Sequence, residues 1–201
     1  MKLAERFLSY PPFYNFVQLL LGMDFYEVAA GEIKKYPHKS VLEIGCGTGE
    51  LLKEITFKSY LGIDINEKYI NYAVQKYAKG NIQFLVDDVT KMGRLNEHFS
   101  LVLVINVIHH FSPTKLNLTL RNISANISFD KIMVIDSQPD FGIFTSLLEK
   151  GDLGSYFREL KTIVGYIEKY FEIQDAKVLS KFYWPYKYPL VVGKKRLFPK
   201  S

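Results

Sequence analysis

The stretch of residues 41–50, VLEIGCGTGE, decides how the rest of the chain is interpreted. Its first residues are apolar apart from Glu43, as in a buried strand, and three glycines follow at alternate positions: Gly45, Gly47 and Gly49. Glycine has no Cβ and accepts positive φ, so the N–H groups and bare α-carbons of such a turn can contact a ligand. The pattern predicts a tight ligand-binding turn directly after a strand.

The spacing of the glycines argues against two common nucleotide-binding turns. The dinucleotide fingerprint has its third glycine three residues after the second, where this chain has Glu50, whose carboxylate would meet a pyrophosphate. The lysine and hydroxyl of a P-loop are also missing. A nicotinamide-dependent oxidoreductase is therefore improbable, and a P-loop enzyme is excluded.

The pattern E-x-G-x-G-x-G after a strand resembles the first motif of class I S-adenosylmethionine-dependent methyltransferases, in the branch that acts on small molecules and quinone precursors. The resemblance implies S-adenosylmethionine as cofactor, with S-adenosylhomocysteine as product, and it covers essentially the whole chain. It places Glu43 near the methionine moiety and implies that the turn contacts the cofactor. The turn residues concerned are Gly45, Cys46, Gly47 and Gly49.

Length and composition limit the possible domain organisation, substrate class and metal binding of the protein. A chain of 201 residues with 48% hydrophobic and 23% charged residues is typical of one globular domain, here a 1–37 helical cap and a 38–201 core. The net charge of +5 permits an RNA substrate without arguing for one. The single cysteine, Cys46, excludes an internal disulfide and a cysteine-rich metal site. Without a signal sequence or a long apolar run, we expect a cytoplasmic protein that binds no membrane.

Apolar periodicity predicts strands that alternate with helices after a helical segment at 13–35, which Gly22 interrupts. The expected strands are 40–45, 59–64, 81–86, 99–105, 130–136, 172–181 and 188–193, and the expected helices are 50–57, 66–78, 113–127 and 156–170. This order predicts an α/β fold with a parallel sheet. A short loop between the last two strands predicts a hairpin, so the sheet should end antiparallel. The order matches the Rossmann-like, doubly wound, seven-stranded class I methyltransferase fold.

Ligands of open α/β sheets bind at the carboxyl ends of strands, so polar residues there are candidates for the cofactor site. Asp64 ends the second strand and matches the family's ribose-binding acid; the alternative role of helix cap suits Asn66 better. Ile65 would then lie against the adenine. After the third strand, the resemblance puts Asp88 at the adenine amino group and the Val89 N–H at a ring nitrogen. Asp87 is the alternative to Asp88.

Two further segments resemble the family. The fourth strand leads into residues 106–111, NVIHHF, which is similar to the N/S-x-LHHF segment of small-molecule methyltransferases and differs from the NPPY motif of many nucleic-acid enzymes. Asn106 should lie near the methionine end of the cofactor. Near the N-terminus, PPFYNFVQ resembles a helix that covers the cofactor, with Tyr14 at the tyrosine position and Asn15 in place of an acid.

Candidates for catalysis are His109 and His110, since a histidine is a natural general base near neutral pH. Capping or packing is their alternative role. Methyl transfer from a sulfonium requires no metal, and much of its catalysis can come from positioning. On the substrate side, Arg158 and Tyr156 follow a glycine-containing segment, and Arg158 could hold an anionic group, or else belong to a surface loop.

The leading hypothesis is a methyltransferase for a small-molecule acceptor. Two rivals stay open: an RNA or protein methyltransferase, and a non-catalytic subunit that binds the cofactor without turnover. Aromatic residues of the last hairpin could wall the acceptor pocket or pack on the sheet: Tyr183, Trp184 and Tyr186.

Overall fold

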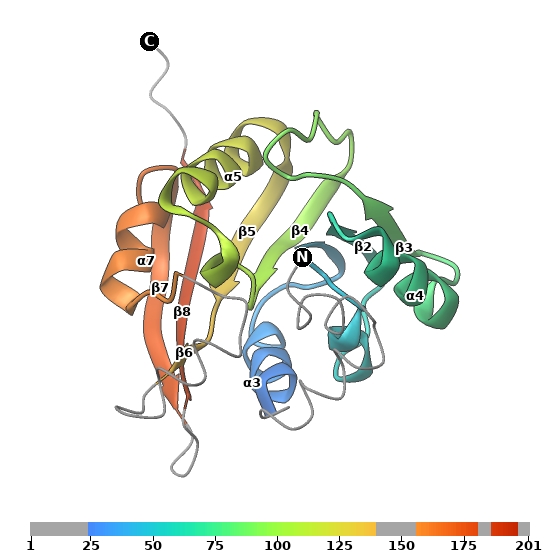
Figure 1. Ribbon diagram of the computed structural model, residues 1–201, viewed down its shortest axis with the longest axis horizontal. Coiled ribbons are helices and arrows are strands. Elements are labelled where there is room, and N and C mark those ends of the chain that lie inside the picture. Colours follow the sequence, from blue (N-terminus) through green and yellow to red (C-terminus); the bar gives the residue numbers. More distant parts are fainter. Residues whose placement is uncertain (1–23, 140–155, 181–185, 197–201) are drawn as a thin grey trace, which may run out of the picture. The chain divides into compact units, whose positions relative to one another are not determined.

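The computed structural model describes residues 24–139, 156–180 and 186–196 (Figure 1). These residues fall into two compact units that divide between Val89 and Thr90. Tyr14, the segment 13–23, Tyr183 and Trp184 lie outside the described residues, as do residues 151–155 before the predicted substrate residues.

The first unit holds three parallel strands in the order β3-β2-β1. Its elements are α3 (Asp24–Ile33), β1 (Ser40–Ile44), the 3₁₀ helix η1 (Glu50–Lys53), β2 (Ser59–Asp64), α4 (Glu67–Tyr77) and β3 (Ile82–Val86). Strand β1 is buried along most of its length, as expected for a strand covered on both faces. Helix α4 packs against β2 and β3 (Figure 1).

The start of α4 shows why Asp64 is available for another role. The side chain of Asn66 caps the helix, because its Oδ1 accepts a hydrogen bond of 3.1 Å from the Lys68 N–H. This confirms Asn66 as the cap. The carboxylate of Asp64 is therefore not needed as the cap of α4. It lies at the end of β2, beside the glycine turn.

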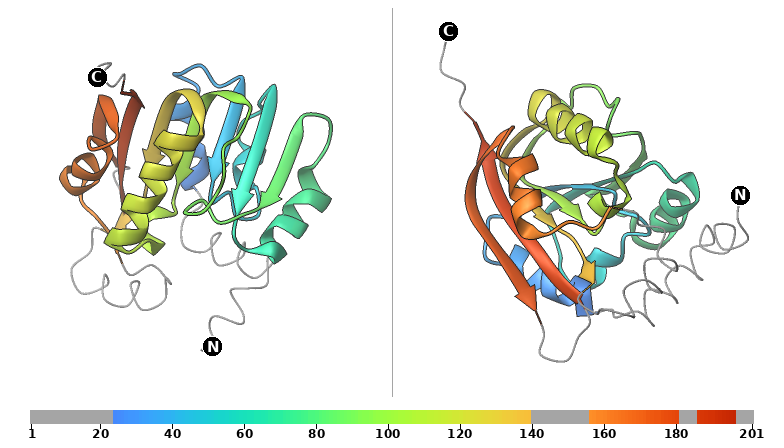
Figure 2. Two further views of the ribbon diagram at one scale, coloured as in Figure 1. Left: turned by 90° about the horizontal axis from the view of Figure 1, so that it is seen from above. Right: turned by 60° about the vertical axis from the view of Figure 1, so that its left-hand side comes forward.

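The second unit combines parallel and antiparallel pairing. Its elements are β4 (His98–Ile105), the 3₁₀ helix η2 (Ile108–His110), α5 (Pro113–Asn126), β5 (Ser128–Ile135), β6 (Gln138–Pro139), α7 (Leu160–Ile167), β7 (Phe171–Ser180) and β8 (Tyr186–Lys195). Strands β4 and β5 are parallel, and β8 runs antiparallel between β5 and β7. Helix α7, orange in Figure 2, packs against β7 and β8.

All seven expected strands are present, and the antiparallel insertion of β8 confirms the expected end of the sheet. Three details differ from the expectation. The helix expected at 50–57 is one 3₁₀ turn of four residues, which starts directly from the left-handed Gly49. Helix α7 is shorter than the periodicity suggested, and the two-residue β6 is too short to give a periodic signal. None of the described helices is long and apolar enough to cross a membrane.

Candidate functional site

The glycine turn after β1 has the backbone that its sequence predicts. Gly45, Gly47 and Gly49 have φ of 73°, 54° and 77°, in the left-handed region that other residues rarely adopt. The last two glycines serve different purposes. A Cβ at Gly49 would lie 3.1 Å from a ring carbon of Tyr77 and 3.3 Å from Phe84, whereas a Cβ at Gly47 would have nothing within 4 Å. Gly49 therefore allows packing, and Gly47 leaves open space above the turn.

Most backbone donors of this turn are used within the first unit. The N–H groups of Gly45 and Cys46 both donate to the carbonyl of Ile63, at 2.7 and 3.1 Å, and Gly49 N–H donates to the Cys46 carbonyl at 3.0 Å. These bonds fix the turn against β2. A ligand that approaches this turn would therefore mainly contact the α-carbon of Gly47, because the N–H groups of Gly45, Cys46 and Gly49 are already bonded.

Asp64 is joined to the glycine turn by its side chain. Its Oδ2 accepts a hydrogen bond of 2.9 Å from the Gly47 N–H, and its Oδ1 accepts one of 2.8 Å from the Asn66 N–H. Two such bonds fix the orientation of a half-exposed carboxylate. The residues predicted for ribose binding and for the cofactor turn are therefore brought together.

Glu43 lies beneath the turn and is almost fully buried, with 2% of its surface exposed. The hydroxyl of Tyr60 donates a hydrogen bond of 2.5 Å to its Oε2. Burial raises the pKa of Glu43 to about 8, and the Tyr60 bond only partly opposes this. Burial also raises the pKa of the Cys46 thiol, which is then a neutral, poorly nucleophilic group. This agrees with a structural role for Cys46.

The end of β3 supplies the residues predicted for the adenine. The Asp87 N–H donates to the Asp64 carbonyl at 3.1 Å, and Oδ1 of Asp87 accepts from the Asp88 N–H at 2.7 Å. Asp87 thus shapes the turn that presents Asp88, while Val89 is buried. Ile65 exposes 62% of its surface, an unusual fraction for an apolar side chain at a strand end. A planar apolar group of a ligand could pack against the exposed side chain of Ile65.

In the second unit, Asn106 directly follows β4 and is the one non-glycine residue with positive φ, at 51°, in the described part of the chain. Its N–H donates to the Ile135 carbonyl at 2.8 Å, and its Oδ1 accepts a bond of 2.6 Å from the Ser137 hydroxyl. The backbone and the side chain are thus both held by the end of β5. A strained residue that is held in this way at a strand end is typical of a functional position.

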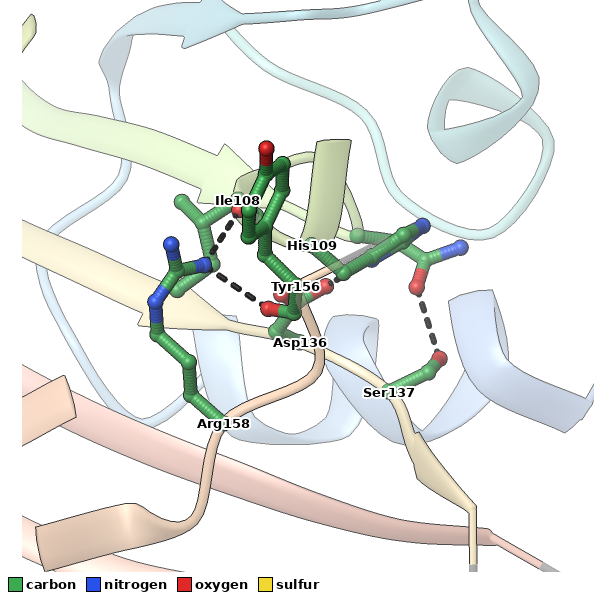
Figure 3. Close-up of polar contacts among 7 residues, drawn as sticks. Ile108, His109, Asp136, Ser137, Tyr156 and Arg158 are labelled. Atoms are coloured by element: carbon green, nitrogen blue, oxygen red, sulfur yellow. Dashed lines mark hydrogen bonds and ion pairs between the residues drawn. The ribbon is translucent and has the colours of Figure 1, made fainter. Parts of the chain in front are cut away.

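His109 and Asp136 form a buried pair (Figure 3). Nδ1 of His109 lies 2.6 Å from Oδ1 of Asp136, and both side chains are at most 3% exposed. The ring of Phe157 stacks on the imidazole, with centroids 5.2 Å apart and planes at 13°. His110, by contrast, is exposed. The pair fixes the tautomer of His109, because the carboxylate accepts the proton on Nδ1 and leaves Nε2 as the basic nitrogen.

Arg158 is occupied by backbone carbonyls (Figure 3). It is 8% exposed, and its guanidinium donates to the carbonyls of Ile108 and Tyr156 at 2.8 Å and of Phe111 at 2.5 Å. The Tyr156 N–H also donates to the His109 carbonyl at 2.9 Å. This arrangement fastens the 156–158 segment to η2. Anion binding by Arg158 would compete with these bonds, whereas the Tyr156 ring is exposed.

Sequence reasoning missed three residues of these clusters. Tyr60, Asp136 and Ser137 each hold a predicted residue: Glu43, His109 and Asn106 respectively. Asp136 and Ser137 follow the fifth strand directly. The rule that led to Asp64 and Asn106, a polar residue at the carboxyl end of a strand, could therefore have found them.

Comparison with known proteins agrees with this picture. Residues 41–128 match a family model described as a methyltransferase domain. A hybrid PKS-NRPS synthetase of Emericella nidulans is 36% identical to the chain over 103 residues, which are 45% of this chain and 3% of the synthetase. The chain thus spans only a small fraction of the curated relative that it matches.

Solved structures share the fold. Magnesium protoporphyrin IX methyltransferase from Synechocystis with bound S-adenosylhomocysteine superimposes with a TM-score of 0.68 at 17% identity, covering 94% of this chain and 96% of the other. Human N-acetylserotonin methyltransferase in complex with S-adenosylmethionine gives 0.67 at 19% identity, covering 91% and 55%. Residues 41–128 are therefore similar to a methyltransferase domain, and the chain has the fold of these class I methyltransferases. These findings confirm the resemblance and the fold class, and the two solved neighbours hold S-adenosylhomocysteine and S-adenosylmethionine respectively.

Proposed function

We propose that this protein transfers a methyl group from S-adenosylmethionine to a small-molecule acceptor. The observation that carries the proposal is the bond of 2.9 Å between the Gly47 N–H and the Asp64 carboxylate, which joins the glycine turn to the predicted ribose ligand. The relative among hybrid PKS-NRPS synthetases supports a small-molecule acceptor. The modest net charge of +5 gives little support to a nucleic-acid substrate.

The residues of the first unit fit the chemistry of this cofactor. Asp64 has acceptor oxygens for the ribose hydroxyls, Asp88 has them for the adenine amino group, and the open space at Gly47 admits a ligand close to the backbone. Exposed Ile65 offers an apolar surface for the adenine ring. When bound, the cofactor supplies the methyl group and the thioether leaving group.

The second unit supplies a candidate base. Asp136 accepts the Nδ1 proton of His109, so Nε2 is the nitrogen able to remove a proton from an acceptor. A carboxylate in this position also stabilises the imidazolium that forms. Because His109 is buried, it would serve only an acceptor group that leaves water on binding. His110 is the exposed alternative.

Cofactor binding is tested by calorimetry with S-adenosylhomocysteine. The wild type should bind it, and Asp64→Asn should weaken binding at least tenfold, because a carboxylate–hydroxyl hydrogen bond is worth about 1.5–3 kcal/mol. Asp130→Asn is the matched control, since Asp130 is exposed on β5 and bonds to His98. Equal binding by Asp64→Asn and the wild type would refute the assigned site.

Transfer is tested with methyl-labelled S-adenosylmethionine and three acceptor sets: small carbonyl and hydroxyl compounds, RNA, and protein. We expect label in a small compound, with His109→Gln and Asp136→Asn strongly impaired and His110→Gln close to the wild type. Label in RNA, together with RNA retention that falls steeply with salt, would favour the nucleic-acid rival. Cofactor binding without transfer to any acceptor would favour the non-catalytic rival.

A further inference from the structure

Strand β3 forms one edge of the sheet in the first unit. Among the described residues, β2 is the only strand that pairs with β3, which ends the order β3-β2-β1 (Figure 1). The Tyr60 N–H donates to the Asn81 carbonyl at 2.9 Å, and the Asp87 N–H donates to the end of β2 at 3.1 Å. Asn81 and Asp87 therefore direct backbone groups toward β2, and this direction alternates along a strand. The residues of β3 whose backbone groups are directed away from β2 are Ile82, Phe84 and Val86.

The side chains of β3 do not protect this edge against pairing. The strand, IQFLV, carries no charge and no proline, and Leu85 and Val86 are 42% and 43% exposed. Edge strands are normally protected by charged side chains, by proline or by a β-bulge. Strand β7, which in the described part of the chain pairs only with β8, has such protection: a register shift between Ile173 and Asp175, and the charged residues Glu172, Asp175 and Lys177. The edge of β3 is thus the better suited of the two to accept a further strand.

The charges at the two ends of the strands of this unit indicate which strand fits. An exposed lysine lies before the start of each strand: Lys39, Lys58 and Lys79. Acidic side chains lie at the opposite ends, with Asp64 at the end of β2, and Asp87 and Asp88 after β3. A second sheet of the same kind that aligned antiparallel would bring its lysines beside these carboxylates, whereas a parallel one would bring like charges together. The edge is therefore complementary to itself in the antiparallel direction.

We propose that β3 pairs antiparallel with β3 of a second copy of this chain, about a two-fold axis at Phe84. Ile82 of each copy then lies opposite Val86 of the other, and Leu85 lies opposite Gln83. Each Phe84 N–H donates to the Phe84 carbonyl of the other copy, and each Val86 N–H donates to an Ile82 carbonyl. The same surface serves both copies, as a two-fold contact requires. This pairing uses the first unit alone and does not depend on the proposed function.

Sedimentation velocity of the full chain at increasing concentration tests the dimer. A pairing this short buries little surface, so the wild type should dissociate with a Kd of about 10 μM to 1 mM. Leu85→Lys places a charge on the edge and should raise the Kd at least about tenfold. Val178→Lys makes the same kind of change at an exposed position of β7, and as the matched control it should leave the Kd unchanged. A wild type that stays monomeric at about 1 mM, or a Leu85→Lys variant that dimerises as the wild type does, would overturn the inference.

Salt dependence tests the contribution of the charges. Attraction between exposed lysines and carboxylates is screened by salt. Raising the salt concentration from about 0.05 M to 0.5 M should therefore increase the Kd of the wild-type dimer at least about threefold. A dimer that tightens with salt would contradict the antiparallel alignment of the charged ends.

Cysteine cross-linking tests the register. Positions 83 and 85 of opposite copies would form a non-hydrogen-bonded pair with Cα atoms about 4.5 Å apart, which a disulfide can span. An equimolar mixture of Gln83→Cys and Leu85→Cys should give a covalent dimer under oxidising conditions. Either variant alone should give little, because like positions lie about 7–8 Å apart across the pairing. The wild type, whose Cys46 is buried, gives the background. Cross-linking that is no stronger in the mixture than in the single variants would overturn the proposed pairing.

Discussion

The Tyr60 hydroxyl donates a 2.5 Å hydrogen bond to Oε2 of Glu43, and both side chains are buried beneath the glycine turn. Within the described part of the chain, no positively charged group lowers the pKa of Glu43. Asp64 on β2 raises the pKa of Glu43 further, and Cys46 is a neutral thiol. The pKa of Tyr60 is itself raised by burial and by Glu43, so Tyr60 stays protonated as a donor. Glu43 is therefore largely protonated at neutral pH.

This protonation predicts a pH dependence of stability. The pKa of Glu43 is about 8 in the folded protein against an ordinary value of 4.5, so the folded state binds more protons between these values. The free energy of unfolding should thus fall as pH rises from 5 to 8, by up to about 1.4 kcal/mol per pH unit from this group. Urea unfolding of the wild type and Glu43→Gln should show curves that diverge with pH. Parallel curves would contradict the prediction.

The sequence predicted the parts of the site that follow from chain order. The glycine turn, Asp64 and Asn106 could be found because each directly follows a periodic apolar run. What the sequence could not supply is the pairing across strands. Tyr60 bonds to Glu43 across 17 positions of the chain, and Ser137 bonds to Asn106 across 31. Such contacts depend on the register between strands, which cannot be derived from a single sequence.

Two of the three glycines of the turn, Gly47 and Gly49, should respond differently to substitution by alanine. Gly49→Ala combines positive φ with a Cβ close to Tyr77 and Phe84, and should cost about 2 kcal/mol of stability. Gly47→Ala adds a methyl group in open space, so it should cost about 1 kcal/mol in backbone strain while weakening S-adenosylhomocysteine binding. Urea unfolding and calorimetry on both variants measure this. A more destabilising change at Gly47 than at Gly49 would refute the distinction.

Arg158 has a structural role in the fold that the sequence did not predict, beside the substrate role that stays a prediction. Its charge and neighbours suggested an anion-binding side chain, but the planar guanidinium spans three carbonyls of two segments. The sequence was enough to single out Arg158 as a candidate. It could not show that the carbonyls of Ile108 and Phe111 would lie within reach of the Arg158 guanidinium.

Arg158→Lys should therefore reduce stability by about 2 kcal/mol, because one ammonium cannot reach the carbonyls of Ile108, Phe111 and Tyr156 together, and the carbonyls that it misses lose a charged donor. Arg121→Lys, at an exposed position of α5, is the control and should stay within about 0.5 kcal/mol of the wild type. Thermal and urea unfolding provide the measurement. An Arg158→Lys variant that is as stable as the wild type and loses only acceptor binding would contradict this prediction and support the substrate role.

The left-handed backbone of Asn106 gives the last prediction. At a φ of 51°, alanine pays a steric penalty that glycine does not, and asparagine tolerates the conformation better than most residues. Asn106→Gly and Asn106→Ala both lose the Ser137 bond, so the difference between them isolates the backbone term. Asn106→Ala should be less stable than Asn106→Gly by about 1 kcal/mol in urea unfolding, although glycine loses more chain entropy on folding. Equal stability, or a more stable alanine variant, would show that this strand end relaxes at no cost and that Asn106 is not held under strain.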